Sequence, residues 1–270
     1  MLYNAKSGEI KTADAEMEYV AFGRGKRQLI LIPGLGDGLR TVRGMEIPLA
    51  FMYRQYAKDY RVYVLSRRKK VPEGFQTRDM AADIKDAMDE IGISKAFIVG
   101  VSQGGMIAQY LAIDFPEYVE KLVLAVTLAR PNETICNAIA AWKDMAESGD
   151  YKGIMRDTAE KSYTAKYVKN SKLMFQIFGN LGKPKSFERF LRMADACVTH
   201  DAYEELSGIT CPTLVIGGKQ DRIATGEASE EVAGRIRGCQ LHMFDDFGHG
   251  VYEETPDFWK CITDFLEEDL

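Results

Sequence analysis

Ser102 stands in a short glycine-rich motif that could expose a nucleophile. The motif is G-V-S-Q-G, residues 100–104; it overlaps the end of the apolar run 96–100 and precedes apolar residues at helical spacing. A serine hydroxyl is a weak nucleophile at its own pKa, so it needs an exposed oxygen and a base that takes its proton. A sharp strand-to-helix turn exposes that oxygen and leaves room only for glycine two positions away on either side. We therefore predict that Ser102 is a nucleophile; the alternative is a glycine-rich helix start that Ser102 caps.

His249 is the predicted base. The chain has three histidines. His200 lies in the helical stretch 130–205, and His242 lies inside a predicted strand, where a surface or core role is expected. His249 lies in F-G-H-G, residues 247–250, between the last predicted strand and the last predicted helix. A loop at this place allows the imidazole to reach over the edge of the sheet.

Asp221 is the predicted acid that orients the base. It follows the apolar run 213–217, in the sequence K-Q-D-R, which places it at the carboxyl end of a predicted strand. A carboxylate there holds the imidazole in position and stabilises its protonated form. The alternative is a surface ion pair between Asp221 and Arg222. The turn after the apolar run 122–126 has no acidic residue and offers no second acid.

Two backbone N–H groups are the predicted donors to an oxyanion. Chemistry at a carbonyl places negative charge on its oxygen, and a pair of N–H groups stabilises that charge. Gln103, which follows the serine at the start of a helix, supplies one of them. Leu35 supplies the other, in P-G-L-G-D-G, residues 33–38, directly after the predicted strand 28–32. The alternative for this segment is an ordinary glycine turn.

The elements that must position these residues alternate along the chain. Apolar runs are separated by stretches of helical period, which is typical of an α/β sheet with crossover helices. Strands are predicted at 17–22, 28–32, 61–65, 96–100, 122–126, 213–217 and 240–244, and helices at 77–91, 104–113 and 256–266. Thr77 is expected to cap the first of these helices. Most of the strands are continuous apolar runs, as expected where helices cover both faces.

Residues 130–205 interrupt this alternation. They contain helical patterns and no convincing strand, so we predict a helical insertion here and a core made of residues 1–129 and 206–270. The insertion is rich in aromatic residues, which are Trp142, Tyr151, Tyr163, Tyr167, Phe175, Phe178, Phe187 and Phe190. These side chains either pack the insertion against itself or line an apolar pocket above the carboxyl edge of the sheet.

The composition excludes several classes of function. A chain of 270 residues suits one core. The net charge is −5 and the cationic residues are scattered, so nucleic acid is not expected as a partner. The run R-R-K-K, residues 67–70, is expected in a solvated loop; the alternative is contact with an anionic substrate or partner. The five cysteines form no CxxC pair or Cys/His cluster, so neither a disulfide nor a metal site is expected. No cofactor is expected either.

The sequence also bears on location. No stretch has the roughly 18 consecutive apolar residues of a membrane span, and residues 1–18 lack the apolar segment of a signal peptide. No membrane span is therefore expected, and a reducing cytoplasm is the expected compartment. The oligomeric state is not predicted.

Taken together, the motifs resemble those of the α/β-hydrolase superfamily, in particular its esterase-like members with a helical cap. The resemblance rests on the loop 33–38, the turn 100–105, the acid turn 218–221 and the histidine loop 247–250, in that chain order. It implies a mostly parallel central sheet flanked by helices, with the insertion as a cap.

Two departures from the family pattern affect the predicted donors. Many relatives have His-Gly where this chain has Pro33-Gly34, so a side chain that helps to support the loop is missing. The sequence S-R-R-K-K, residues 66–70, also replaces the usual arginine- and glycine-rich turn. Neither change removes a backbone donor.

The resemblance implies a serine hydrolase of carboxylesterase type that cleaves a small ester, or a similar compound with an apolar acyl group, through an acyl-enzyme. The same three side chains would serve a carbon–carbon bond hydrolase, a lactonase, a thioesterase or a cofactor-free perhydrolase. Another class also fits the motifs, namely a receptor or signalling partner that binds a small molecule and turns it over slowly. The fold alone does not choose among these.

Overall fold

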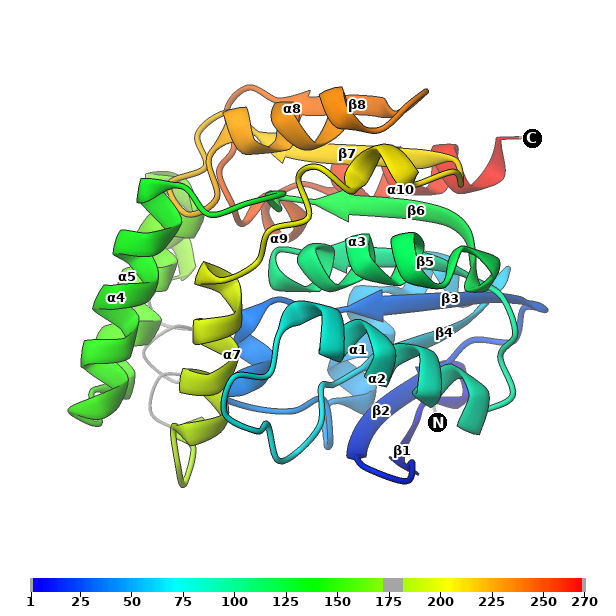
Figure 1. Ribbon diagram of the computed structural model, residues 1–270, viewed down its shortest axis with the longest axis horizontal. Coiled ribbons are helices and arrows are strands. Elements are labelled where there is room, and N and C mark those ends of the chain that lie inside the picture. Colours follow the sequence, from blue (N-terminus) through cyan, green and yellow to red (C-terminus); the bar gives the residue numbers. More distant parts are fainter. Residues whose placement is uncertain (1, 172–181, 269–270) are drawn as a thin grey trace.

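The structure is a computed structural model that describes residues 2–171 and 182–268, and in this part of the chain eight strands form one sheet (Figure 1). Their order is β1-β2-β4-β3-β5-β6-β7-β8. β1 pairs antiparallel with β2, and β2 with β4; all further pairs are parallel. The bounds are β1 Lys6–Lys11, β2 Glu16–Phe22, β3 Arg27–Ile32, β4 Tyr60–Leu65, β5 Ala96–Val101, β6 Val119–Ala125, β7 Thr213–Gly218 and β8 Gln240–Phe244.

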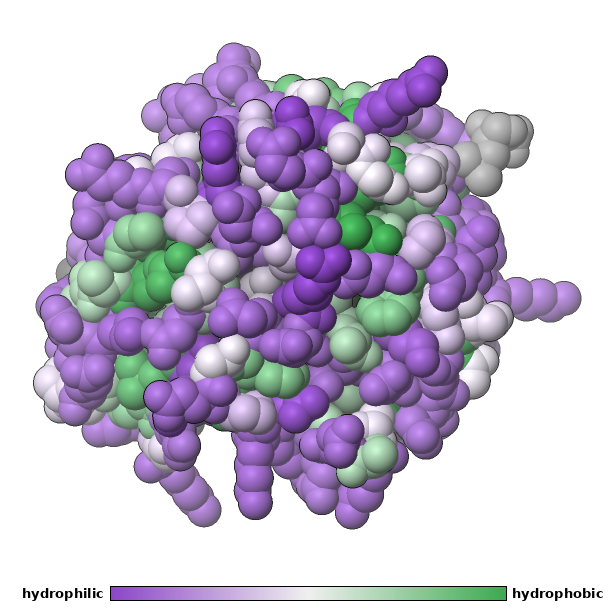
Figure 2. Space-filling view, in the orientation of Figure 1, coloured by the Kyte–Doolittle hydropathy of each residue, from purple (hydrophilic) through white to green (hydrophobic). Residues whose placement is uncertain are grey.

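Helices cover both faces of the sheet. One face carries α2 (Thr77–Glu90), α3 (Gln103–Asp114) and α8 (Gly226–Arg235), and the other carries α1 (Glu46–Met52), α9 (Val251–Glu254) and α10 (Pro256–Glu267). Neighbouring side chains of a strand point to opposite faces, so Ile98 packs under the first group and Phe97 under the second. The outer surface over α2, α3 and α8 is largely hydrophilic (Figure 2). The apolar side chains of both layers therefore form the core against the sheet.

All seven predicted strands are present, and the predicted α/β-hydrolase architecture is confirmed. The first strand, β1, was missed because its sequence, K-S-G-E-I-K, is polar. Only Ile10 of this edge strand is fully buried, so the sequence carries no apolar run. The expectation that Thr77 caps α2 is wrong. Gln76 is the N-cap, and its main-chain N–H donates to the side chain of Asp79, whereas Thr77 is buried beneath the helix.

The chain between β6 and β7 is helical where the structure describes it. Helices α4 (Glu133–Glu147), α5 (Tyr151–Ser162) and α7 (Glu188–Val198) lie here, and residues 165–171 are also helical. In Figure 1 these helices stand beyond the carboxyl ends of the parallel strands. They occupy the place at which ligands bind in open α/β sheets.

The aromatic residues of this region differ in burial. Trp142 and Phe190 are buried in the core cluster, and the Trp142 indole N–H donates to Asp157, which joins α4 to α5. For these two the packing interpretation holds. Tyr151 is also buried, and Tyr163, Tyr167 and Phe187 are partly exposed. Phe175 and Phe178 lie outside the described residues.

Candidate active site

Ser102 occupies the turn between β5 and α3. Its backbone has φ 55° and ψ −121°, a conformation that residues other than glycine rarely adopt. Two hydrogen bonds of 2.8 Å hold it there: the Ser102 N–H donates to the carbonyl of Ala125, and the Thr127 hydroxyl donates to the carbonyl of Ser102. The Ser102 side chain makes no capping bond to α3, so the interpretation of this serine as a helix cap is wrong.

The glycines of the motif allow backbone segments to approach closely. A Cβ on Gly104 would lie 1.9 Å from the carbonyl oxygen of Ile32, and a Cβ on Gly100 would lie 2.4 Å from the carbonyl oxygen of Gly104. Real Cβ atoms do not approach backbone oxygen so closely, so a side chain at either position would force the turn open. The sequence argument for glycine at both positions is confirmed.

Ser102, His249 and Asp221 form a chain of hydrogen bonds. The distance from Ser102 Oγ to His249 Nε2 is 2.9 Å, and that from His249 Nδ1 to Asp221 Oδ2 is 2.8 Å. An ionised carboxylate can only accept, so Nδ1 carries the ring proton and Nε2 is free to accept the proton of the serine. The imidazole is 6% exposed and Asp221 is 7% exposed. The structure thus brings the three predicted residues into the arrangement of a Ser-His-Asp triad.

Asp221 is held in its ionised form. Burial alone would raise the pKa of this carboxyl, but His249 lowers it, and so do the N–H groups of Ile223 and Ala224, which donate to Oδ1 at 2.7 and 3.0 Å. The pKa of Asp221 therefore lies below its ordinary value. The alternative of an ion pair between Asp221 and Arg222 is wrong, since the Arg222 guanidinium donates to the backbone carbonyl of Glu160.

The loops that carry the acid and the base pack backbone against backbone. The turn after β7 carries Asp221, and the loop between β8 and α9 carries His249. A Cβ on Gly218 would lie 2.5 Å from the carbonyl oxygen of Phe247, and the Gln220 N–H donates to that oxygen at 2.9 Å. This contact fixes the distance between acid and base.

The two other histidines have other surroundings. His200 is buried, with Nδ1 2.8 Å from the Thr77 hydroxyl and Nε2 3.1 Å from Oε1 of Gln109. Burial lowers the pKa of His200 to about 3, so the ring is neutral. His242 is exposed on β8 and contacts the ring of Phe244. Neither contacts Ser102, in agreement with the prediction that His249 is the base.

The two predicted oxyanion donors begin the two helices next to Ser102. Gln103 is the first residue of α3, and Leu35 is the first residue of the 3-10 helix η2, Leu35–Gly38. The N–H of the first residue of a helix has no acceptor within that helix, so it is available to a ligand. Gly34 contacts the nucleophile, since a Cβ there would lie 3.3 Å from the Cβ of Ser102. The structure brings both segments to Ser102; the donor role of the two N–H groups stays a prediction.

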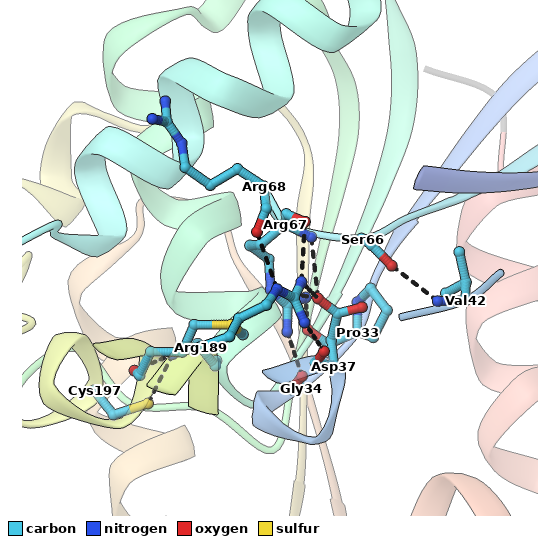
Figure 3. A network of polar contacts seen from close by, with 11 residues as sticks. Pro33, Gly34, Asp37, Val42, Ser66, Arg67, Arg68, Arg189 and Cys197 are labelled. Carbon is cyan, nitrogen blue, oxygen red and sulfur yellow. Dashed lines mark hydrogen bonds and ion pairs between the residues drawn. The ribbon is translucent and has the colours of Figure 1, made fainter. Parts of the chain in front are cut away.

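Arg67 supports the loop of Leu35 from beneath. The prediction that residues 67–70 are a solvated loop is wrong for Arg67, which is 1% exposed. Its guanidinium donates to the carbonyl of Pro33 at 2.5 Å and to that of Gly34 (Figure 3). These bonds support the loop that lacks the histidine of many relatives. The segments that follow β3 and β4 emerge at the same edge because the two strands are parallel neighbours, a pairing that the structure shows and the run of cations does not indicate.

Asp37 pairs with this arginine. Oδ2 of its carboxylate accepts a hydrogen bond from the main-chain N–H of Arg67 at 3.0 Å and lies 3.4 Å from Nε of the Arg67 side chain. The same oxygen accepts a hydrogen bond from the Arg189 guanidinium at 2.5 Å. Burial alone would raise the pKa of Asp37, but the two guanidinium groups outweigh burial and hold the pKa below its ordinary value. Sequence reasoning missed Asp37 and Arg189, because an acidic residue in a glycine loop and an arginine in a helix carry no distinctive pattern.

Within residues 2–171 and 182–268, histidine, cysteine and acidic side chains form no group of three or more that could hold a metal ion. Among the helices of the same ranges, none has both the length and the hydrophobicity of a membrane span.

Comparisons with known proteins agree with this fold. A family profile described as the alpha/beta hydrolase fold matches residues 28–151. The monoacylglycerol lipase abhd6-B of Xenopus laevis is 27% identical over 197 residues, which are 68% of this chain and 58% of the lipase. The 3-oxoadipate enol-lactonase 2 of Acinetobacter baylyi is 26% identical over 216 residues, 78% of each chain. The solved structure of the enol-lactonase from Burkholderia xenovorans LB400 has a TM-score of 0.82 at 22% identity, covering 97% of this chain and 100% of that one.

The chain has the α/β-hydrolase fold, which the profile matches over residues 28–151 and the solved structure matches over nearly the whole chain. The match spans less than two thirds of the length of the lipase and more than three quarters of the lactonase. Both relatives are hydrolases by name, which supports a hydrolase at the level of the class.

Proposed function

We propose that the protein is a serine hydrolase that cleaves a small carboxylic ester through an acyl-enzyme. The observation that carries this proposal is the pair of contacts at His249, with Nε2 2.9 Å from Ser102 Oγ and Nδ1 2.8 Å from the Asp221 carboxylate. This geometry suits general-base activation of a serine. A neutral imidazole that merely filled space would not need both contacts.

The reaction follows from these contacts. His249 takes the proton of Ser102 as Oγ attacks the carbonyl carbon, and Asp221 stabilises the imidazolium that forms. The N–H groups of Leu35 and Gln103 donate to the oxyanion of the tetrahedral intermediate. The imidazolium then protonates the leaving alkoxide, which departs as an alcohol. Water, deprotonated by His249, attacks the acyl-enzyme, and the acid and free Ser102 are released.

We further propose that residues 130–205 form a cap that holds an apolar acyl group. Leu35 belongs to the same apolar cluster as Ile139, Phe190 and Met193 of the insertion. The insertion thus packs apolar side chains toward the predicted oxyanion loop, which supports an aliphatic or aromatic acyl chain over a charged one.

Cyclic esters are the second candidate. The enol-lactonase matches along 78% of this chain and of its own length, and such a substrate needs no change in the steps at Ser102. Opening a lactone differs only in that the leaving alkoxide stays attached to the acyl group. Thioesters, carbon–carbon bonds, peracid formation and slow-turnover ligand binding remain alternatives, which a substrate panel read as kcat/KM separates.

Ser102→Ala tests the proposal. The variant is expected to lose turnover of short p-nitrophenyl esters while keeping the circular dichroism spectrum of the parent, because Oγ forms the acyl bond. A fluorophosphonate is expected to label the parent at Ser102 only. Ser207→Ala is the matched control, since Ser207 is an exposed serine in the short 3-10 helix Leu206–Gly208, and this variant should retain both turnover and labelling. Turnover that survives in Ser102→Ala would refute the proposal.

A further inference from the structure

Arg189, on helix α7, reaches from the insertion to the segments beneath the predicted oxyanion donor Leu35. Its side chain is 13% exposed. The guanidinium donates to four oxygen atoms, which are the backbone oxygens of Asp37, Arg67 (2.9 Å) and Arg68 (2.9 Å) and the carboxylate of Asp37 (2.5 Å). A guanidinium has five N–H groups in a rigid fork, so one side chain can satisfy several acceptors at fixed positions.

These contacts continue to the loop of Leu35. Arg189 contacts Asp37, Asp37 contacts Arg67, and Arg67 donates to the carbonyls of the two residues that precede Leu35 (Figure 3). The side chains of Arg67 and Asp37 are 0% and 1% exposed, so water does not substitute for a lost partner at low cost. A displacement of α7 is therefore transmitted to the loop.

The same helix contacts the residue of the second donor. The side-chain amide of Gln103 donates to the carbonyl of Met193 at 2.6 Å and lies 3.1 Å from the sulfur of Cys197. On the other side, a Cβ on Gly38 would lie 2.9 Å from the Cα of Phe190, so η2 and α7 meet without an intervening side chain. Helix α7 thus contacts the helix of each predicted donor.

We propose that α7 sets the relative position of the two oxyanion donors and that Arg189 is the positioning residue through which it acts on Leu35. The inference rests on the serine-hydrolase function proposed above. Arg189 would not touch the substrate; it would act by holding η2. Oxyanion donors must lie about 2.7–3.1 Å from the oxygen, and a displacement of about 1 Å can lower the rate about 100-fold. The insertion would then control the rate of acyl transfer as well as access to the site.

Arg189→Met tests this role, and Arg192→Met is the matched control. Methionine keeps an unbranched apolar stem and removes the fork. Arg192 lies on the same helix, but its side chain is 30% exposed and pairs with the exposed Glu73 at 3.3 Å. Two readouts are needed for each variant: kcat and KM for a p-nitrophenyl ester, with kcat normalised to the sites that a fluorophosphonate labels, and amide hydrogen exchange of residues 34–39.

We expect Arg189→Met to lower the normalised kcat about 10- to 100-fold, with KM within about twofold of the parent, and to speed exchange of residues 34–39. Arg192→Met should match the parent in all of these. Arg189→Lys should recover part of kcat, since an ammonium can still reach the Asp37 carboxylate but cannot contact four oxygens at once. If Arg189→Met does not fold, Arg189→Lys is the test, and a parental kcat in that variant overturns the proposal.

The remaining outcomes separate the two proposals. A role of Arg189 in stability alone would reduce the labelled fraction but leave kcat per labelled site and loop exchange at the parental values, and this result overturns the inference. If the parent itself neither turns over esters nor is labelled at Ser102, yet loop exchange still responds to Arg189→Met alone, the serine-hydrolase function is refuted while the coupling of α7 to the loop is supported.

Discussion

The neutral state of His200 leads to a quantitative prediction for the variant His200→Gln. The ring is 1% exposed and lies between a hydroxyl of Thr77 and the side-chain oxygen of Gln109, neither of which is charged. Burial therefore lowers its pKa from 6.5 to about 3. Glutamine offers an amide that can bond to the same neighbours, and it removes the titration.

The sign and size of the effect follow from linkage. The folded pKa lies below the unfolded one, so the unfolded state binds the proton first, and stability that is complete above pH 6.5 falls as the pH drops toward 3. With an unfolded pKa of 6.5, protonation lowers the free energy of the unfolded state by about 2 kcal/mol at about pH 5, relative to about pH 8. The parent should thus lose about 2 kcal/mol more than His200→Gln over this range.

Urea unfolding followed by tryptophan fluorescence at several pH values measures this difference. Carboxyl groups that titrate in the same range are common to both proteins, so they cancel in the comparison. His242→Gln is the control, because His242 is exposed, and it should keep the pH dependence of the parent. Equal pH dependence in the parent and His200→Gln would show that the ring accepts a proton in the folded state, and the account of a buried neutral histidine would be refuted.

Three further variants test the predicted machinery. Arg67→Met leaves the carbonyls of Pro33 and Gly34 without their buried donor and removes one of the two guanidinium groups beside Asp37, so it should cost about 3–5 kcal/mol in urea unfolding. Lys70→Met, which removes an exposed charge from the same run, should cost about 0.5 kcal/mol or less. A small loss in Arg67→Met would contradict the support role. Gly104→Ala should abolish fluorophosphonate labelling of Ser102, because the new Cβ would lie 1.9 Å from the carbonyl oxygen of Ile32. Gly234→Ala is the control: the space at this helical position is open, so its free energy of unfolding should rise by up to about 1 kcal/mol. Labelling of Gly104→Ala at the parental rate would show that the turn has room for a side chain. Asp221→Asn should lower kcat roughly 10⁴-fold with little change in KM. The new amide can donate to Nδ1 of His249 and so favour the tautomer whose proton is on Nε2, which cannot accept the proton of Ser102. A fall in kcat of less than about tenfold would exclude Asp221 as the orienting acid.

The fold and the three residues that meet at the candidate site could be predicted because each has a local cause in the sequence. Strands buried on both faces appear as apolar runs, and the turn at Ser102 needs glycine at fixed distances. The histidine and the acid follow the ends of later strands in a known order. The edge strand β1 had no such signal, because an exposed strand needs no apolar run and is defined by its pairing with β2.

The support of the oxyanion loop could not be predicted in the same way, because it depends on contacts between distant parts of the chain. Arg67 and Asp37 are 30 positions apart, and Arg189 and Asp37 are 152 apart. A run of four cations is usually solvated, and only the tertiary structure shows that the first of them is buried. The missing histidine before Gly34 was the one local indication that another group must hold the loop.

The charges of this cluster do not balance, and this has a consequence for the reaction. Two guanidinium groups, of Arg67 and Arg189, meet one carboxylate, that of Asp37. The excess positive charge is partly satisfied by backbone carbonyl oxygens of the loop and of the turn after β4. It contacts Pro33 and Gly34, the residues that precede the predicted oxyanion donor Leu35. In surroundings from which water is largely excluded, such a charge stabilises an oxyanion in addition to the N–H donors. A histidine in the place of Pro33 could support the loop, but it would not supply a permanent charge. If the N–H groups of Leu35 and Gln103 hold an oxyanion as proposed, the buried cluster would both support the loop and add positive charge near that oxyanion.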